Sequence, residues 1–241
     1  MTEETNNQTF ELDPLKETYR TNIAEAPGQT QSLERHNTAL LCIDVQYLDA
    51  APGYGVFGAD NTSGLTPESQ AYYFNRLDEL VLPNVNRLQN SFRANRLEVI
   101  HTRIQSMTQD GRDRGPGHKR LGLLATPGSK EAEFLPQVAP RGDEIIINKT
   151  ASGVFSATNI EYILRNMGIT GLVVVGVYSN ECVSTAVRDA CDLGFYTTLV
   201  SDAIATVTPE LENATIMTMK DRYARVMTTE EVINEIEDVL V

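Results

Sequence analysis

The sequence predicts an α/β fold: a three-layer, doubly wound sheet of about six mostly parallel strands with helices on both faces. One observation is the β-branched apolar run from Leu172 to Val177, which is typical of a strand buried on both faces. A second is that strand-like and helix-like stretches alternate along the chain, as they do in βαβ units. A third is the length of 241 residues with 41% hydrophobic content, which is enough for one large domain with a core.

Composition narrows the classes of partner. The formal net charge of −13 argues against nucleic acid or an anionic membrane as a partner, because both require clustered Lys and Arg. No apolar run approaches the roughly 18 residues of a membrane span. Three cysteines without paired spacing (Cys42, Cys182 and Cys191), together with no signal peptide, predict a cytoplasmic protein without a disulfide framework. The net charge says little about a small-molecule substrate, because local charge can oppose net charge.

The first segment, residues 1–37, is polar, and we interpret it as an arm that is either partly disordered or laid across a neighbouring surface. The predicted domain covers residues 38–241. Its first strand, residues 38–46, carries Asp44 directly after four apolar residues. A carboxylate in such a place is costly without a partner or a function, although an Asp can also cap the next turn.

Two long irregular segments follow different strands. Residues 49–66 are rich in Gly and are either a lid or substrate loop, or a surface excursion. Residues 105–143 contain a basic cluster at 110–120, for which pairing with acids is favoured over contact with a polar or anionic substrate. Between them, we expect a helical turn or two in 67–82, and a helix with Pro83 in its first turn.

The remaining elements have clear boundary signals. The second strand, 97–104, contains His101, which we interpret as a satisfied core or edge residue rather than a ligand. The third strand, 144–149, ends on Lys149, and a capping box at 158–161 begins the helix that stops at Gly168. After the fourth strand come a fifth at 196–202, a helix opened by Thr208 and Pro209, a short sixth strand at 224–228, and a final helix capped by Thr228 and Glu231.

Three chemically useful side chains lie at the ends of predicted strands. Asp44, Lys149 and Cys182 follow strands one, three and four, and the carboxyl ends of parallel strands share one edge. Cys182 also opens a helical run, where unpaired N–H groups and the helix dipole lower a thiol pKa. A nearby Lys favours the thiolate, and an Asp can take and return its proton. The alternative is a small buried Cys that packs a turn.

Three segments carry a resemblance to a known family. They are Leu-Leu-Cys-Ile-Asp44-Val-Gln, Asn-Lys149-Thr-Ala-Ser-Gly-Val-Phe155, and Gly-Val-Tyr-Ser-Asn-Glu-Cys182-Val. These resemble the signature segments of the isochorismatase-like cysteine hydrolases, and the likeness covers roughly residues 38–235. That superfamily includes nicotinamidases, N-carbamoylsarcosine amidases, ureidoacrylate amidohydrolases and biuret hydrolases. The resemblance implies a catalytic triad of Asp44, Lys149 and Cys182, and a cis peptide at Val177–Tyr178. It further implies an oxyanion hole formed by the N–H groups of Tyr178 and Cys182.

The resemblance also implies an activity. A nucleophilic Cys182 separates the chain from the non-hydrolytic isochorismate branch. Where nicotinamidases have a metal-binding Asp-x-His pair, this chain has His101-Thr-Arg103, so we expect no metal and no cofactor. The remaining activity is hydrolysis of the C–N bond of a small linear amide, and the substrates that we expect first are ureides and carbamoyl compounds. Alternatives are maleamate-like or nicotinamide-like amides, or a catalytically idle binding or scaffold protein.

Position 178 departs from the family, which usually has a small residue or Thr there, whereas this chain has a bulky Tyr followed by Ser179. The expected pocket residues are Gln46, Tyr47, Arg103, Phe155 and Tyr178, of which all but Tyr178 could equally well pack the core or rim. Family analogy and the polar arm suggest a homo-oligomer.

Two other functional classes fit poorly. A nucleotide-binding oxidoreductase would have Gly-x-Gly-x-x-Gly after the first strand, where this chain has Asp44-Val-Gln-Tyr. A thiol redox sensor would need a resolving cysteine near Cys182. Cys191 follows nine residues later, about 13 Å away along a helix, which is too far for a disulfide.

Overall fold

A computed structural model describes residue 33 and residues 37–60 and 63–239. Its six strands form one sheet, and every adjacent pair is parallel. The strands are β1 (Thr38–Ile43), β2 (Glu98–Ile104), β3 (Ile145–Lys149), β4 (Gly171–Val177), β5 (Tyr196–Ala205) and β6 (Arg225–Met227). The predicted fold class is confirmed, and the strands lie within a few residues of their predicted positions.

The strand order places a crevice at the centre of the sheet. The order is β3-β2-β1-β4-β5-β6, so the chain starts at β1, moves outward to β3, and returns to the other side of β1 at β4. The connection after β1 therefore leads toward one edge of the sheet, and the connection after β4 leads toward the opposite edge. Open α/β sheets bind ligands outside the carboxyl ends of their strands at such a switch point.

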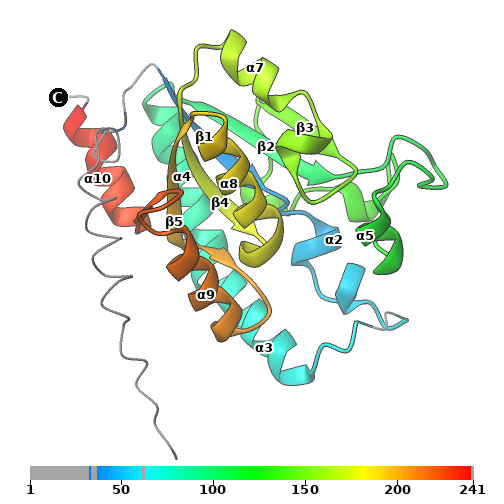
Figure 1. The fold of residues 1–241 in the computed structure, drawn as a ribbon. Helices are drawn as coiled ribbons and strands as arrows, with labels where there is room; N and C mark the ends of the chain where they lie inside the picture. The colour runs from blue at the N-terminus through cyan, green and yellow to red at the C-terminus, as the bar shows by residue number, and fades with distance from the viewer. Residues whose placement is uncertain (1–32, 34–36, 61–62, 240–241) are drawn as a thin grey trace, which may run out of the picture.

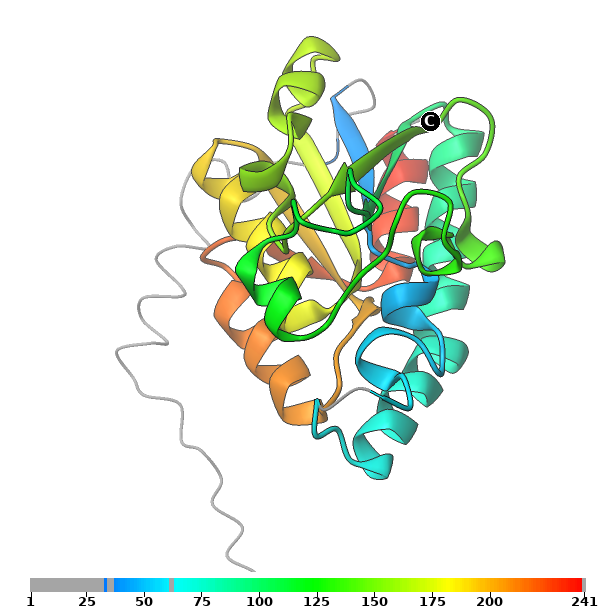
Figure 2. The same ribbon diagram turned by 90° about the vertical axis from the view of Figure 1, so that its right-hand side faces the viewer.

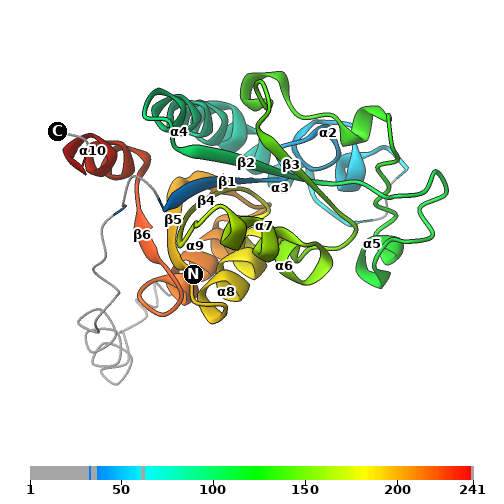
Figure 3. The same cartoon turned by 90° about the horizontal axis from the view of Figure 1, so that it is seen from above.

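Helices cover both faces of the sheet. On one face lie α4 (Leu82–Ala94) and α10 (Thr229–Val239), and on the other α7 (Ile160–Asn166), α8 (Ser184–Asp192) and α9 (Pro209–Met219) (Figures 1 and 3). Strand residues alternate between the two cores. Leu40 of β1 packs in the cluster that contains Val85 of α4, whereas Leu41 packs in the cluster that contains Val187 of α8.

The helix before α4 is longer than predicted. We expected a turn or two in 67–82, but α3 (Pro67–Arg76) continues through the π-helical segment η2 (Leu77–Val81) directly into α4. The N–H of Leu82 bonds the carbonyl of Leu77, five residues back. Pro83 has no N–H to donate, and a wide turn before it relieves the clash of its ring with the preceding turn.

Two of the three predicted capping signals form. Thr208 caps α9 by accepting from the N–H of Leu211, and Thr228 and Glu231 exchange hydrogen bonds at the start of α10. The box at 158–161 does not form. There Thr158 accepts from the N–H of Ile160 at 3.1 Å and donates to the carbonyl of Val154, so its hydroxyl joins two short helices instead of closing a box.

Short helical elements connect the strands and the longer helices. They are α2 (Tyr47–Ala50), η1 (Gly55–Phe57), α5 (Pro116–Arg120), η3 (Lys130–Ala132), η4 (Pro136–Val138), α6 (Val154–Ala157) and η5 (Ser179–Val183). Figure 2 turns toward the viewer the side that carries the segments around residues 50 and 118. In the basic cluster, Arg114 donates to the carbonyls of Gly111 and Leu123, and Lys119 to that of Arg112. Arg112 makes the expected pairing with an acid, since its Nη1 lies 3.0 Å from Asp110 Oδ1, whereas Arg114 and Lys119 bind backbone carbonyls of their own segment.

The predicted arm lies almost entirely outside the described residues. Leu33 is described; it is buried, and its N–H donates to the Glu235 carboxylate at 2.8 Å. Within the described part of the chain, no helix combines the length and apolar character needed to cross a membrane.

Candidate active site

Asp44 follows β1 at the central crevice. Its φ of 53° lies in the left-handed region, which Asp enters more readily than most residues. The side chain is fully buried, and its Oδ1 accepts from the Thr102 hydroxyl at 2.8 Å. The N–H of Asp44 donates to the Thr102 carbonyl. Both bonds tie the residue to β2, so the carboxylate has a fixed position.

Lys149 is the last residue of β3 and is fully buried. Its Nζ lies 2.7 Å from Asp44 Oδ2 and 3.3 Å from Cys182 Sγ, and it donates to the Ala151 carbonyl at 3.1 Å. Burial lowers the pKa of the ammonium, but the neighbouring charges of Asp44 and Cys182 outweigh it and leave the pKa raised. The Lys149 ammonium therefore stays charged and joins the other two side chains.

Cys182 lies in η5, the π-helical turn between β4 and α8, and is 3% exposed. Burial raises the pKa of its thiol, the charge of Lys149 lowers it, and the charges of Asp44 and Asp49 raise it again. The net effect is a raised pKa. The sequence predicted a lowered one from the helix terminus and the lysine, but burial dominates. The resting thiol is therefore protonated, with the Asp44 carboxylate as the adjacent base.

The turn that carries Cys182 is fixed by a hydrogen bond to the buried carboxylate of Glu212. Ser179 donates to Glu212 at 2.9 Å, and the same oxygen accepts from the N–H of Thr206 at 2.9 Å. Arg76 lies 3.5 Å from the other oxygen of Glu212. The hydroxyl at position 179 thus anchors η5 to α9 and fixes the place of the thiol.

Tyr178 forms one wall of the site. The Val177–Tyr178 peptide is cis, as the family resemblance implies. The Tyr178 hydroxyl donates to the Asp49 carbonyl at 3.0 Å, and the Tyr73 hydroxyl donates to the same carbonyl at 2.7 Å. Both tyrosine rings pack with Phe57 of η1, so the 49–66 segment is attached to this wall.

Two of the expected pocket residues have their polar groups occupied. Gln46 is fully buried, and its amide donates to the carbonyls of Ile104 and Glu131 while its oxygen accepts from the N–H of Ile104. Arg103 donates to Asn148 at 2.7 Å and to the Ala132 carbonyl at 2.9 Å. Since Thr102 points to Asp44, Arg103 points to the other face of β2. Both side chains therefore bind groups of the protein itself.

The two expected aromatic contacts also have other neighbours. The Phe155 ring lies 5.9 Å from that of Phe195, which directly precedes β5 at the amino edge of the sheet. Lys130 Nζ lies over the Tyr47 ring, 3.9 Å from the ring centroid, in a cation–π contact. The Tyr47 ring also makes a T-shaped contact with the ring of Tyr54. Tyr178 directly precedes the turn that carries Cys182, and its role as a pocket residue stays a prediction.

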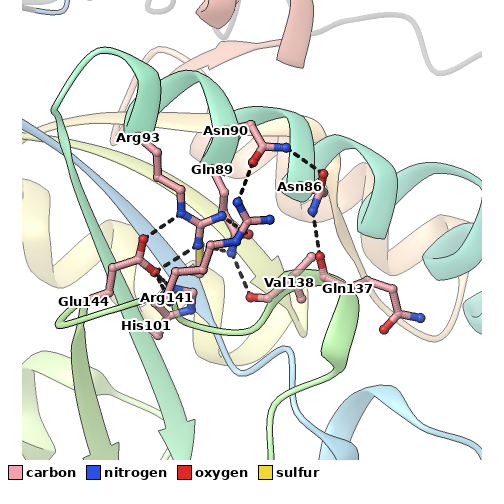
Figure 4. Close-up of polar contacts among 10 residues, drawn as sticks. Asn86, Gln89, Asn90, Arg93, His101, Gln137, Val138, Arg141 and Glu144 are labelled. Atoms are coloured by element: carbon pink, nitrogen blue, oxygen red, sulfur yellow. Dashed lines mark hydrogen bonds and ion pairs between the residues drawn. The ribbon is translucent and has the colours of Figure 1, made fainter.

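His101 belongs to a polar network on the α4 side of the sheet (Figure 4). Its Nε2 lies 2.9 Å from Glu144, which also takes two hydrogen bonds from Arg93. Burial lowers the pKa of His101, so the imidazole is neutral at pH 7 and donates to Glu144. His101 is a satisfied core residue, as the sequence predicted, and the prediction of no metal stays a prediction.

Two residues beside the triad were not singled out from the sequence, Asp49 and His118. Asp49 is 2% exposed, and its charge acts on the pKa values of both Cys182 and Lys149. His118 is buried, and the charges of Lys149 and Asp44 act on its pKa. An available signal for Asp49 was its position among apolar residues, between Leu48 and Ala50.

Comparison with known proteins gives the same family as the motifs. An isochorismatase domain model matches residues 38–231. The ureidoacrylate amidohydrolase RutB of Agrobacterium fabrum is 25% identical over 231 residues, covering 83% of this chain and 90% of that protein. The N-carbamoylsarcosine amidase of an Arthrobacter species is 25% identical over 164 residues, covering 66% of this chain and 62% of that protein.

A solved structure supports the fold. The cysteine hydrolase from Pseudomonas syringae pv. phaseolicola 1448A superimposes with a TM-score of 0.72 at 23% identity, covering 89% of this chain and 99% of that one. At this identity the likeness establishes the architecture alone.

Proposed function

The chain belongs to the isochorismatase family of hydrolases, and we propose that it is a cysteine-dependent amidohydrolase acting on a small linear amide. The observation that carries this proposal is the position of Lys149 Nζ, 2.7 Å from Asp44 and 3.3 Å from Cys182. An acid, a cation and a thiol from three strands thus meet at the switch point of the sheet. This set supplies a base, a charge and a nucleophile.

The first half of the proposed reaction forms a thioester. Asp44 takes the proton of Cys182, and the sulfur attacks the amide carbonyl carbon. The N–H groups of Tyr178 and Cys182 hold the developing oxyanion, an interaction worth about 3 kcal/mol per donor. Asp44 then gives the proton to the departing nitrogen, the C–N bond breaks, and ammonia or an amine leaves.

The second half releases the product. Asp44 takes a proton from a water molecule, which attacks the thioester carbonyl, and the thiolate of Cys182 leaves and is protonated again. The charge of Lys149 stabilises the thiolate in both halves. The raised pKa of the resting thiol fits this sequence, because the thiol then needs the Asp44 carboxylate as its base.

Ureides and carbamoyl compounds are the substrate class that we place first. The relatives at 25% identity are named for ureidoacrylate and N-carbamoylsarcosine, and both compounds carry a carbamoyl group. The triad itself acts on the carbonyl and the leaving nitrogen, so it sets the reaction type. The residues around it set the substrate.

The proposal is tested by ammonia release from ureidoacrylate, biuret, N-carbamoylsarcosine, maleamate and nicotinamide. Cys182→Ala is compared with wild type, and Cys191→Ala, which removes a half-buried thiol of α8, is the matched control. We expect release from a ureide or carbamoyl compound, lost in Cys182→Ala and kept in Cys191→Ala. Turnover that survives Cys182→Ala would refute the nucleophile.

A catalytically idle binding protein is the second candidate, and the burial of Cys182, which is 3% exposed, is the observation that favours it. Iodoacetamide labelling separates the two. Rapid labelling of Cys182 at neutral pH, slowed by Asp44→Asn, marks an activated thiol and supports the enzyme. Labelling no faster than that of Cys191 supports the idle protein.

A further inference from the structure

Buried side-chain atoms without a hydrogen-bond partner are concentrated at the active site. Within the described residues there are four of them: Asp44 Oδ2, Asp49 Oδ2, His118 Nδ1 and Glu212 Oε1. Asp44 and Glu212 each have an ion pair, with Lys149 and Arg76 respectively. Asp49 has no such pair in the described part of the chain. A buried carboxyl oxygen without a partner is costly, and in a native protein it calls for an explanation.

The backbone around Asp49 is rigidly held. The residue lies in α2, five residues after Asp44, and its carbonyl accepts from the hydroxyls of Tyr73 and Tyr178. The two tyrosine rings lie 5.3 Å apart. Since Tyr178 is also the residue of the proposed oxyanion hole, the same wall fixes both the hole and the backbone of Asp49.

The carboxyl group of Asp49 lies beside the triad. When Asp49 is ionised it raises the pKa of Cys182 and of Lys149, and the charges of Asp44 and Lys149 act in turn on the pKa of Asp49, so these groups are neighbours. Lys149 already contacts Asp44, Cys182 and the Ala151 carbonyl with its three donors, so it does not satisfy Asp49. Asp49 Oδ2 therefore remains without a hydrogen-bond partner in the described residues.

We propose that Asp49 is a specificity-determining residue, which binds the non-reacting polar end of an uncharged ureide or amide substrate through paired hydrogen bonds. This inference rests on the proposed function. A carboxylic acid and an amide or urea group are complementary, because the O–H donates to the carbonyl and the acid's C=O accepts from the N–H. A substrate with a carboxylate at that end would place a second negative charge near Asp44.

The protonation state of Asp49 fits this pairing. Burial first, and then the negative charge of Asp44, raise the pKa of Asp49 well above its ordinary value. The raised pKa favours the protonated carboxyl, which carries both a donor and an acceptor. Asparagine has the same shape and the same pair of groups, whereas leucine has the shape without either group.

The test measures binding without turnover, as protection of Cys182 from iodoacetamide. The protecting compounds are biuret, N-carbamoylglycinamide and its carboxylate counterpart N-carbamoylglycine, applied to wild type, Asp49→Asn and Asp49→Leu. Asp60→Leu, an exposed position in the same loop, is the control. Asp49→Ala replaces Asp49→Leu if the latter does not fold. Labelling of each variant without ligand checks that the triad is intact.

We expect Asp49→Leu to weaken protection by the two uncharged compounds about tenfold or more, the size of losing a buried pair of hydrogen bonds, while Asp49→Asn stays within about threefold of wild type. N-carbamoylglycine should protect wild type about tenfold less well than its amide. Equal protection in Asp49→Leu and wild type would overturn the inference. A loss of protection in Asp49→Asn as large as in Asp49→Leu would also overturn the inference. The same holds if no compound protects Cys182 of the wild type.

Turnover is measured separately, so that the two proposals fail in different ways. Protection that depends on Asp49, without ammonia release from any compound, refutes the proposed hydrolysis and leaves the binding role of Asp49 in place. Ammonia release with the same KM in Asp49→Leu and wild type refutes the role of Asp49 and leaves the hydrolysis in place. A raised KM with little change in kcat supports both.

Discussion

Two polar clusters of this protein, one partly and one fully buried, differ in how completely their hydrogen-bonding groups are satisfied. On the α4 side, the Glu144 network consists of Gln89, Arg93, His101, Arg141 and Glu144. Its acid receives hydrogen bonds from two side chains and from the N–H of Arg141. At the carboxyl edge lie all four buried side-chain atoms without a hydrogen-bond partner in the described residues. In a cluster that only stabilises the fold, every polar group can have a partner within the protein. In a site that binds a substrate, some polar groups lack such a partner until the substrate supplies it.

The comparison also separates two uses of a buried charge. The Glu144 network joins α4, β2 and the start of β3, three elements whose separation it fixes (Figure 4). The Asp44–Lys149 pair joins the ends of β1 and β3 and points its charge at a thiol. Removing a group should therefore affect stability alone in the first cluster, and both stability and activity in the second.

The largest expected effect is on activity. Cys182→Ser should lower ammonia release about 10³-fold or more, because an alkoxide is far harder to form than a thiolate and Lys149 cannot offset that difference. The variant should keep wild-type stability within about 0.5 kcal/mol, since the side-chain volumes are similar. The measurement is steady-state kinetics with thermal unfolding. A variant with unchanged kcat would remove Cys182 from the mechanism.

Lys149→Met should affect both properties. It keeps the length of the side chain but leaves the fully buried Asp44 carboxylate without its cation, which is expected to destabilise the fold by about 3–5 kcal/mol. Activity should be lost as well. Adding Asp44→Asn to Lys149→Met removes the unpaired charge and should restore much of the stability without restoring activity. Denaturant unfolding of the two variants checks this, and additive losses would contradict a coupled pair.

Glu144→Gln should affect stability alone, by about 2 kcal/mol at pH 7, with kcat unchanged. Burial raises the pKa of Glu144, but hydrogen bonds from Arg93, the Arg141 N–H and His101 lower it to about 2. The folded-state pKa lies below the unfolded value, so this stabilisation is present above about pH 4.5 and is lost as pH falls toward 2. The difference between wild type and variant should therefore shrink in acid. A difference that does not depend on pH would mean that the charge of Glu144 contributes nothing.

The smallest effect should come from an exposed pair. Arg87 and Glu230 form an ion pair with side chains 48% and 64% exposed. Arg87→Ala should change stability by about 0.5 kcal/mol or less, because solvent screens the pair. Thermal unfolding with Glu144→Gln alongside makes the contrast direct. A loss as large as that of Glu144→Gln would show that burial is not what distinguishes the two pairs.

The sequence predicted the sheet and the position of the triad for one physical reason. Parallel strands end at a common edge, so residues that follow them meet although they are far apart in the chain. The sequence could not predict which way the side chains of Gln46 and Arg103 point. Arg103 faces away because Thr102 beside it bonds Asp44, and Gln46 is used by backbone groups of Ile104 and Glu131.

Asp49 and His118 illustrate a different limit. They lie in α2 and α5, elements of four and five residues that are too short to show a periodic pattern. Their positions depend on tertiary packing, such as the two tyrosine hydroxyls that hold the Asp49 carbonyl. The net pKa of Cys182 could not be predicted for a similar reason, since it depends on how deeply the thiol is buried.

The central claim is that Cys182 forms a covalent intermediate with an amide substrate, and mass spectrometry of a quenched reaction tests it most directly. The enzyme is mixed with the most rapidly hydrolysed carbamoyl compound, quenched in acid within milliseconds, and digested. The account predicts that the peptide carrying Cys182 gains the mass of the acyl group, that hydroxylamine removes it, and that Cys182→Ala shows no adduct. Turnover with an unmodified Cys182 peptide, or an adduct on another residue, would contradict the account.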